Sequence, residues 1–336
     1  MTKEKRVKPV NVGVIGAGYW GRKVIQEYLN LSQINKDVRL LAVSDVSPNS
    51  LALYKDKAHI PFLYSDFKEL IEHPDIDAVH ICTPNESHFN IGMTALKAGK
   101  HVLMEKPIAV TPQHASEMVS FAHFRERILC VGHIYRFNNA IDEARRIIQS
   151  KKLGRLFHVR LQWTTYESLM LGRDIIFDLG PHPIDIMNKL LDDWPETVNC
   201  NAISCRQTNE EVAYISCEFK DGLSSQVEMS WLLPGKVRDL SIIGSEGSLK
   251  IDCLNQKMEL YNGNHHTLTL EAVANNTILS EITHFVQNVS RVRDEKAQAN
   301  LQNSGVLGAR VVDVLTAAKE SRRNKRAVHV NYNRYD

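Results

Sequence analysis

The sequence lacks a strong charge imbalance, a long apolar run and a paired cysteine motif. Its 336 residues carry 41 Lys and Arg against 39 Asp and Glu, which gives a formal net charge of +2. So small a net charge gives no electrostatic case for a nucleic-acid partner. No apolar run approaches the length that spans a bilayer, and residues 1–6 lack the apolar region of a signal peptide. We therefore expect a cytoplasmic protein that binds neither nucleic acid nor a membrane.

Cysteine is present but is not arranged for a disulfide framework or a zinc site. None of the 6 cysteines forms a C-x-x-C pair, and most of them stand in apolar, strand-like runs. Such cysteines are typical of buried, reduced thiols. We expect no structural metal.

The order of apolar segments predicts two domains of different architecture. Between residue 10 and about residue 131, apolar β-branched runs alternate with helical patterns, which is typical of a doubly wound parallel sheet covered on both faces. Beyond this point period-two alternation dominates, which favours a large, mostly antiparallel sheet. The expected fold is therefore α/β, with residues 1–128 binding a dinucleotide and residues 129–336 forming an α/β domain for substrate binding and oligomer contacts.

A glycine motif follows the first apolar run, at Gly16-x-Gly18-x-x-Gly21. Gly16 permits a tight turn, Gly18 lets backbone approach a pyrophosphate, and Gly21 allows a helix to pack closely on a strand. The phosphates would then lie on the helix N-terminus, beside Tyr19 and Trp20. The order strand, glycine turn and helix therefore predicts a dinucleotide site.

The second strand ends at Asp45, 24 residues beyond Gly21. A carboxylate at this position accepts hydrogen bonds from the ribose hydroxyls of NAD and repels the 2′-phosphate of NADP. No arginine follows immediately, so NAD is favoured over NADP. The alternative is that Asp45 merely starts the turn at Ser47 and caps the next helix.

Polar residues also follow the third long strand, at Cys82-Thr83-Pro84-Asn85. Pro84 breaks the ladder and leaves Thr83 and Asn85 free to face a ligand. His88 lies in the first turn of the following helix.

The next strand ends in the charged pair Glu105-Lys106, which is fixed by Pro107. A lysine directly after a buried strand suggests a functional position, and the bond to Pro107 can be cis. A surface turn with an incidental lysine is the alternative.

One segment of the second half, residues 174–185, breaks the β pattern. Pro181 and Pro183 fit only the first turn of a helix, so the helix begins near Gly180 and ends near residue 191. His182 then lies at its N-terminal end with Asp178 just before it, an arrangement that suits a general base. A purely structural His–Asp pair is equally compatible. Metal ligation that also uses Asp185 lacks a fourth ligand.

These motifs together resemble the Gfo/Idh/MocA oxidoreductases, the family of glucose–fructose oxidoreductase and inositol 2-dehydrogenase, over nearly the whole chain. Four landmarks occur in family order: the glycine motif, Thr83-Pro84-Asn85-x-x-His88, Glu105-Lys106-Pro107 and Asp178-x-x-x-His182. The turn at residues 244–248 resembles a fifth.

The resemblance implies a Rossmann domain followed by an α/β domain whose open sheet often serves in oligomer contacts, so a homodimer or homotetramer is expected. It also implies that Lys106 approaches the nicotinamide and the substrate hydroxyl, that His182 accepts a proton, and that Asp178 supports it. Arg136 lies where the family often has an arginine that lines the site. The expected cofactor-binding residues are Gly16, Gly18, Tyr19, Trp20, Gly21, Asp45, Cys82, Thr83, Asn85, His88, Glu105 and Lys106.

The chain departs from the family pattern before the histidine motif. Many members have several glycines there, whereas this chain has Gly172-Arg173-Asp174. We expect Arg173 and Tyr166 to set specificity, and an arginine suits an anionic substrate such as a uronate or a nucleotide-sugar.

The expected function is hydride transfer between NAD and a secondary alcohol of a sugar, cyclitol or nucleotide-sugar. Two alternatives remain, because a fold alone does not establish an activity. One is a non-catalytic NAD-binding sensor, and the other is a glycosidase or eliminase that recycles NAD.

Overall fold

A computed structural model describes residues 8–55, 60–169, 172–262, 267–295 and 299–332. The chain forms two compact units, Met1–Gly132 with Ile278–Ala309, and His133–Thr277 with Arg310–Asp336. The sequence predicts one boundary between residues 128 and 129, with each domain formed by a continuous stretch of chain. The first compact unit extends to Gly132 and also includes residues 278–309.

The first unit contains a parallel sheet of six strands in the order β3-β2-β1-β4-β5-β6. This strand order confirms the predicted doubly wound plan, in which ligands bind beyond the carboxyl ends of the strands. The strands are β1 Val10–Ile15, β2 Val38–Ser44, β3 Phe62–Tyr64, β4 Ala78–Ile81, β5 His101–Met104 and β6 Leu129–Val131.

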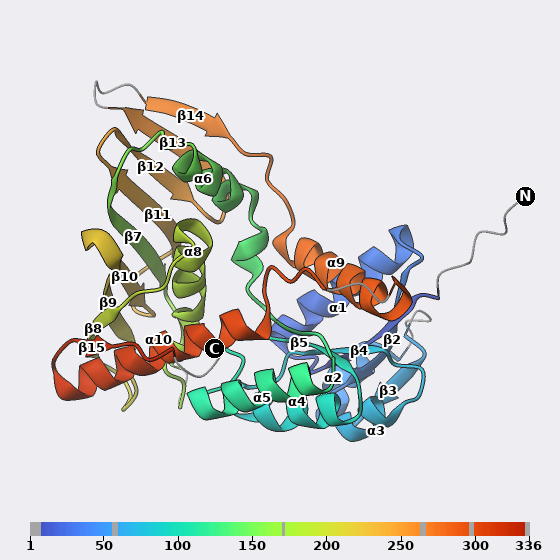
Figure 1. Ribbon diagram of the computed structural model, residues 1–336. Helices are drawn as coiled ribbons and strands as arrows, with labels where there is room; N and C mark the ends of the chain where they lie inside the picture. The colour runs from blue at the N-terminus through green and yellow to red at the C-terminus, as the bar shows by residue number, and fades with distance from the viewer. Residues whose placement is uncertain (1–7, 56–59, 170–171, 263–266, 296–298, 333–336) are drawn as a thin grey trace, which may run out of the picture. The chain divides into compact units, whose positions relative to one another are not determined.

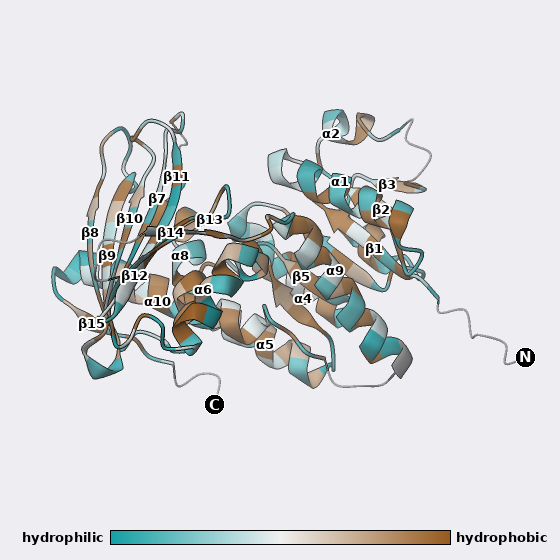
Figure 2. Cartoon of the chain, turned by 90° about the horizontal axis from the view of Figure 1, so that it is seen from above, coloured by the Kyte–Doolittle hydropathy of each residue, from teal (hydrophilic) through white to brown (hydrophobic). Residues whose placement is uncertain are grey.

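Helices cover both faces of this sheet (Figure 1). On one face, Val12 and Val14 of β1 share a buried cluster with α1 (Tyr19–Ile34) and α9 (Thr277–Ser290). On the other face lie α3 (Phe67–Glu72), α4 (His88–Lys97) and α5 (Pro112–Phe124). Figure 2 shows β1 and β5 largely hydrophobic, whereas α1 carries both kinds of residue, as expected for an amphipathic covering helix. The short helices α2 (Pro48–Ala52) and η1 (Asn85–Ser87) complete the loops after β2 and β4.

The second unit contains a sheet of nine strands in the order β14-β13-β12-β11-β7-β10-β9-β8-β15. β10 runs parallel to β7, whereas the other neighbouring pairs are antiparallel. The predicted mostly antiparallel sheet is therefore confirmed. The strands are β7 Leu156–Thr165, β8 Thr197–Ile203, β9 Val212–Glu218, β10 Ser224–Ser230, β11 Lys236–Gly244, β12 Gly247–Asp252, β13 Lys257–Asn262, β14 Thr267–Glu271 and β15 Val328–His329.

One face of the second sheet is packed under helices. Trp163 of β7 is fully buried in a cluster with α6 (Asn139–Gln149), α8 (Pro181–Leu191) and the part of α10 (Gly305–Asn324) that belongs to this unit. On the opposite face, Arg160 and Gln226 are exposed beside Glu228. This alternation is the pattern expected of an antiparallel sheet with one covered face.

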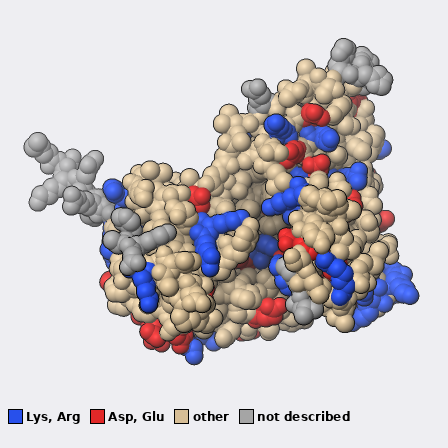
Figure 3. Space-filling view, turned by 180° about the vertical axis from the view of Figure 1, so that it is seen from behind, with Lys and Arg blue, Asp and Glu red and all other residues tan. Residues whose placement is uncertain are grey.

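The surface agrees with the near-neutral net charge. On the face in Figure 3, Lys and Arg side chains are interspersed with Asp and Glu. All six cysteines are free, and four of them are buried, as predicted, whereas Cys205 is exposed. Over the described ranges, the structure contains no helix with both the length and the apolar character needed to cross a membrane.

Candidate active site

The glycine turn after β1 has the backbone geometry that a dinucleotide site requires. Gly16 has a φ of +96°, and a Cβ built there would lie 2.7 Å from the carbonyl oxygen of Cys82. A Cβ on Gly21 would lie 1.9 Å from the carbonyl oxygen of Gly16, so α1 packs too closely for any side chain. A Cβ on Gly18 would meet nothing within 4 Å. Gly16 and Gly21 are therefore required by the fold, whereas Gly18 leaves space for a ligand.

Asp45 lies against this turn. Its Oδ2 atom accepts a hydrogen bond from the backbone N–H of Ala17 at 2.6 Å, and its Oδ1 atom accepts one from Ser47 at 2.8 Å. The helix cap of α2 is Ser47, whose side chain accepts from the N–H of Ser50. Asp45 therefore starts the turn, as the alternative interpretation held, but it also joins the second strand to the glycine turn.

These features fit a dinucleotide cofactor. The N-terminus of α1 has no side-chain cap and no acidic residue in its first turn, so nothing there opposes a pyrophosphate. The open space at Gly18 and the carboxylate of Asp45 flank this helix end.

Beyond β4, the side chain of His88 is held inside the protein. It is buried, with Nδ1 2.7 Å from the carbonyl oxygen of Pro107 and Nε2 2.9 Å from that of Thr83. Burial lowers the pKa of His88, although the two carbonyl contacts and Glu105 oppose the shift. Ser87 Oγ donates to Thr83 Oγ1 at 2.7 Å. Because a neutral imidazole carries one N–H, His88 donates to one of the two carbonyl oxygens and lies against the other, between the loops that follow β4 and β5.

Beyond β5, Glu105 is also buried, whereas Lys106 is half-buried. Glu105 Oε1 accepts a hydrogen bond from the indole N–H of Trp20 and lies 3.3 Å from His80 Nε2. Burial by itself raises the pKa of Glu105, but His80, Trp20 and Lys106 outweigh it and hold the pKa below its usual value. The Lys106–Pro107 bond is cis.

In the second unit, α8 begins at Pro181 and ends at Leu191, as predicted. His182 therefore lies in its first turn, half-buried, with its ring edge-to-face on Tyr135 at a centroid separation of 5.1 Å. Asp178 lies in the preceding helix, α7 (Ile175–Leu179). The segment between them needs Gly180, because a Cβ there would lie 2.3 Å from the backbone carbonyl oxygen of Ile176.

Arg173 forms an ion pair with Asp178, with Nη2 and Oδ1 2.5 Å apart. The side chain of Arg173 is 49% exposed, and its guanidinium lies 5.9 Å from the ring centre of Trp231. Tyr166 is exposed near the guanidinium of Arg206. Arg173 thus reaches the carboxylate that precedes the predicted catalytic histidine.

Arg136 lies in a different environment from Arg173. It is 5% exposed, and its Nε atom donates to Asp185 Oδ1 at 2.5 Å, while Nη2 donates to Asn188. Asp185 and Asn188 both belong to α8. Its predicted role as a substrate residue stays a prediction, but its present partners attach the segment before α6 to the helix that carries His182.

The predicted residues thus gather in two sets. The first unit brings together the glycine turn, Asp45, Thr83, His88 and Glu105, and the second brings Arg173 to Asp178. His80 was not expected from the sequence. The available signal was a polar residue inside the otherwise apolar strand β4, but nothing in the sequence indicated Glu105 as its partner.

The carboxylates near His182 are each paired with an arginine. Asp178 pairs with Arg173, and Asp185 pairs with Arg136. Within the described residues, the group whose ligand atoms lie close enough to share an ion, within 4.8 Å of one another, is His80, Cys82 and Glu105. Glu105 Oε1 is already engaged there by Trp20.

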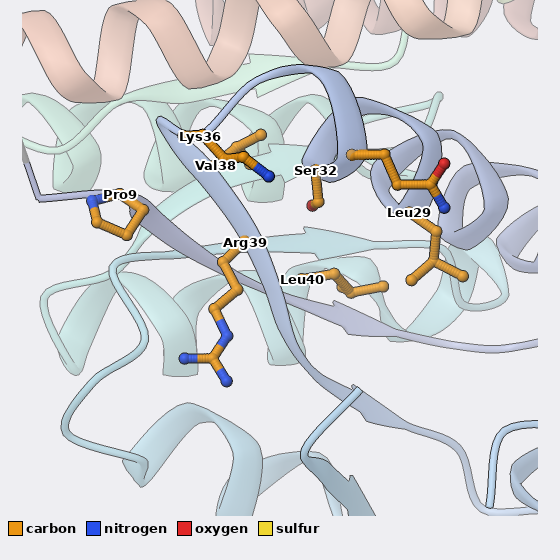
Figure 4. Close-up of a pocket in the computed structure, with 8 residues that line it drawn as sticks. Pro9, Leu29, Ser32, Lys36, Val38, Arg39 and Leu40 are labelled. Atoms are coloured by element: carbon orange, nitrogen blue, oxygen red, sulfur yellow. The ribbon is translucent and has the colours of Figure 1, made fainter. Parts of the chain in front are cut away.

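A separate hollow of about 350 Å³ lies at the amino ends of β1 and β2, at the end of these strands away from Gly16 (Figure 4). Arg39 and Lys36 line it together with Leu29 and Leu40. None of the predicted site residues belongs to it, so it adds nothing to the cofactor site.

A parallel sheet in this strand order, with a glycine turn after β1 and a carboxylate after β2, defines a dinucleotide-binding α/β protein. Residues 10–133 match the family described as "Oxidoreductase family, NAD-binding Rossmann fold", and residues 141–250 match the GFO/IDH/MocA C-terminal domain. The chain belongs to the Gfo/Idh/MocA oxidoreductase family.

Known relatives include cyclitol and sugar dehydrogenases. A 1-carboxy-3-chloro-3,4-dihydroxycyclohexa-1,5-diene dehydrogenase of Comamonas testosteroni is 31% identical over 191 residues, which cover 54% of this chain and 47% of that protein. Myo-inositol 2-dehydrogenase of Thermotoga maritima is 23% identical over 95% of this chain and 98% of its own. The structure of a levoglucosan dehydrogenase in complex with NADH superposes with a TM-score of 0.87 at 20% identity, covering 96% of this chain and 100% of that one. The last likeness concerns the fold.

Proposed function

We propose that this protein is an NAD-dependent dehydrogenase that oxidises a secondary alcohol of a sugar, cyclitol or nucleotide-sugar. The observation that carries the proposal is the presence of Lys106, Asp178 and His182 in a chain whose glycine turn is formed for a dinucleotide. A sensor would need the cofactor residues alone. The dehydrogenase activity named for the myo-inositol relative supports the same reaction class.

NAD, when bound, would supply the acceptor for a hydride from the carbon that carries the alcohol. In this proposal the glycine turn holds the pyrophosphate, Asp45 accepts hydrogen bonds from the adenosine ribose, and Thr83 and Asn85 face the cofactor. The carboxylate at Asp45 disfavours a 2′-phosphate, which supports NAD as the cofactor rather than NADP.

The protein's own groups manage the hydroxyl proton. We assign His182 as the base that removes it and Lys106 as the donor that stabilises the developing negative charge on the same oxygen. Lys106 belongs to the first unit and His182 to the second, and the family resemblance assigns both to one reaction. Asp178 supports the histidine.

The position and exposure of Arg173 favour a substrate that bears a carboxylate or phosphate. A half-exposed guanidinium already paired with Asp178 can exchange this partner for an anionic group on the substrate, because planar guanidinium binds both in the same manner. The carboxylated substrate in the name of the Comamonas relative fits this class. A neutral polyol would leave the Arg173–Asp178 pair intact.

Two further expectations stay predictions. The first is a homodimer or homotetramer built through the open face of the nine-stranded sheet, which follows from the resemblance, and the second is a cytoplasmic location. Light scattering of the purified protein measures the first.

The proposal is tested by incubating the protein with NAD and a panel of polyols, aldoses, uronates and nucleotide-sugars while NADH absorbance is recorded. We expect NADH with at least one member and higher kcat/KM for an anionic one. Arg173→Met should raise KM for that substrate at least tenfold, whereas Arg155→Met, a matched exposed arginine, should not. Cofactor binding without turnover of any member would favour a sensor, and product without net NADH would favour an NAD-recycling enzyme.

A further inference from the structure

Glu105 is a carboxylate buried in the first unit, one residue before Lys106. Its side chain is 9% exposed, and Oε1 is shared by two donors, the indole N–H of Trp20 and the ring of His80. The carboxylate packs against Gly132, where a Cβ would stand 2.7 Å from Oε2 and 3.1 Å from Oε1. The carboxylate therefore occupies a site that the surrounding chain has shaped for it.

The two partners come from elements that also form the cofactor turn. Trp20 stands between Gly18 and Gly21, in the first turn of α1. His80 lies in β4, two residues before Cys82, whose carbonyl oxygen excludes a side chain at Gly16. Glu105 thus joins the ends of three segments that surround the predicted pyrophosphate site.

The other flank of Lys106 is held as well. The carbonyl oxygen of Pro107 lies 2.7 Å from His88 Nδ1, and the opposite ring nitrogen lies 2.9 Å from the carbonyl oxygen of Thr83. Buried groups therefore flank Lys106 on both sides, the side chain of Glu105 before it and the ring of His88 against the Pro107 carbonyl oxygen after it, and they define where its flexible side chain begins.

We propose that His80 and Trp20 are positioning residues, which hold the Glu105 carboxylate and through it fix Lys106 relative to the glycine turn. This proposal rests on the proposed function, because it assigns Lys106 a place in the reaction. It changes the expected role of Glu105, whose side chain would support Lys106 rather than contact NAD. A reacting group displaced by about 1 Å can lose about a hundredfold in rate, so such a support has a measurable effect.

The test compares two substitutions of His80. His80→Phe keeps a ring but removes the nitrogen that faces Glu105, and His80→Gln keeps an amide donor at similar reach. We expect His80→Phe to lower kcat about tenfold, with KM and the NAD dissociation constant within about twofold, and His80→Gln to recover most of the rate. His123→Phe on the exposed side of α5 is the matched control and should leave kcat unchanged.

A double-mutant cycle with Lys106→Ala identifies the residue through which His80 acts. If His80 acts through Lys106, adding His80→Phe to Lys106→Ala causes no further loss. Independent, multiplicative losses would overturn the positioning role while leaving the dehydrogenase assignment intact. Undiminished turnover of Lys106→Ala alone would instead contradict the proposed function.

A measurement without substrate tests the positioning role of His80 and Trp20 even if no turnover is found. Labelling of Lys106 by 1-fluoro-2,4-dinitrobenzene is followed by peptide mass spectrometry, with exposed Lys97 as the internal reference. Release of Glu105 in His80→Phe should change the Lys106 rate at least about threefold relative to Lys97, since a neighbouring charge moves. In NMR spectra, the indole N–H resonance of Trp20 is assigned as the one that disappears in Trp20→Phe. This resonance should shift in Glu105→Gln relative to the wild-type protein. Unchanged labelling and an unmoved resonance would refute the proposal.

Discussion

Asp45 accepts a hydrogen bond at 2.6 Å from the backbone N–H of Ala17, within the glycine turn itself. The contact fixes a negative charge beside the turn, at the point where the ribose of a dinucleotide would lie. Cofactor choice is therefore tied to a residue that also shapes the turn, and a substitution must separate the two roles.

Asp45→Asn removes the charge while its amide oxygen can still accept from Ala17, although the hydrogen bond from the backbone N–H of Ser47 is lost with it. We expect wild-type protein to bind NAD at least tenfold more tightly than NADP, and the variant to narrow this preference mainly by binding NADP better. Quenching of intrinsic fluorescence by each cofactor measures both constants. Asp66→Asn, at the cap of α3, is the control. An unchanged preference would show that Asp45 does not contact the ribose.

Gly18 and Gly21 should respond differently to substitution by alanine. A Cβ on Gly21 would meet the Gly16 carbonyl oxygen, whereas one on Gly18 meets no protein atom within 4 Å. We expect Gly21→Ala to lower the free energy of unfolding by about 2 kcal/mol, as overpacking does. Gly18→Ala should leave stability unchanged and weaken NAD binding. Urea unfolding and cofactor titration of both variants test this contrast, and equal losses of stability would contradict it.

His101 should make the stability of the protein depend on pH. Burial, with a contribution from Arg127 and Arg293, lowers its pKa from 6.5 to about 4. Its Nδ1 atom accepts from the backbone N–H of Ile128 at 3.0 Å, which requires the neutral ring. Because the unfolded state binds the proton more readily, the stabilisation is complete above about pH 6.5 and is lost as pH falls toward 4.

Between pH 7 and pH 5 this residue should therefore remove about 2 kcal/mol of stability. His101→Gln keeps an acceptor for Ile128 but cannot be protonated, so its unfolding free energy should fall less over the same interval. Urea titrations at the two pH values give the difference. Parallel pH dependence of the two proteins would mean that His101 has the same pKa in the native and unfolded states, which would contradict the prediction.

The buried pair of Arg136 and Asp185 should contribute to the stability of the second unit. Arg136→Met leaves the carboxylate of Asp185 buried without its cation, which typically costs about 3 kcal/mol. The double variant Arg136→Met with Asp185→Leu removes both charges and should recover part of the loss. Thermal unfolding reports the effect. If the loss of stability in the double variant equals the sum of the losses in the two single variants, the two side chains do not interact in solution.

Much of the fold followed from local patterns. The glycine turn, the alternation of strands and helices before residue 131 and the proline-initiated helix α8 were all predicted, because each depends on neighbours in the sequence. The strands β13 and β14, at one end of the nine-stranded sheet, were not predicted, since their alternation is weak and polar. The parallel pairing of β10 with β7 was also invisible, because periodicity does not identify a partner strand.

The site was predictable as a set of motifs but not as a set of contacts. Asp45 and Glu105 were both expected to bind cofactor, but the groups that their carboxylates contact were not predicted. Asp45 accepts from the backbone N–H of Ala17, and Glu105 contacts Trp20 and His80, and the folded sheet brings these groups together. Likewise α9 joins the first unit although its sequence lies near the C-terminus. Such relationships depend on tertiary packing, which a single sequence does not display.

The central claim, that Lys106 and His182 carry out an NAD-linked oxidation, is tested most directly by the turnover of Lys106→Ala and His182→Ala. NADH formation is measured with the substrate identified in the panel, beside the dissociation constant for NAD. The account predicts that each variant loses at least about a hundredfold in kcat while NAD binding stays within a few fold. Turnover near the wild-type rate in both variants would contradict it.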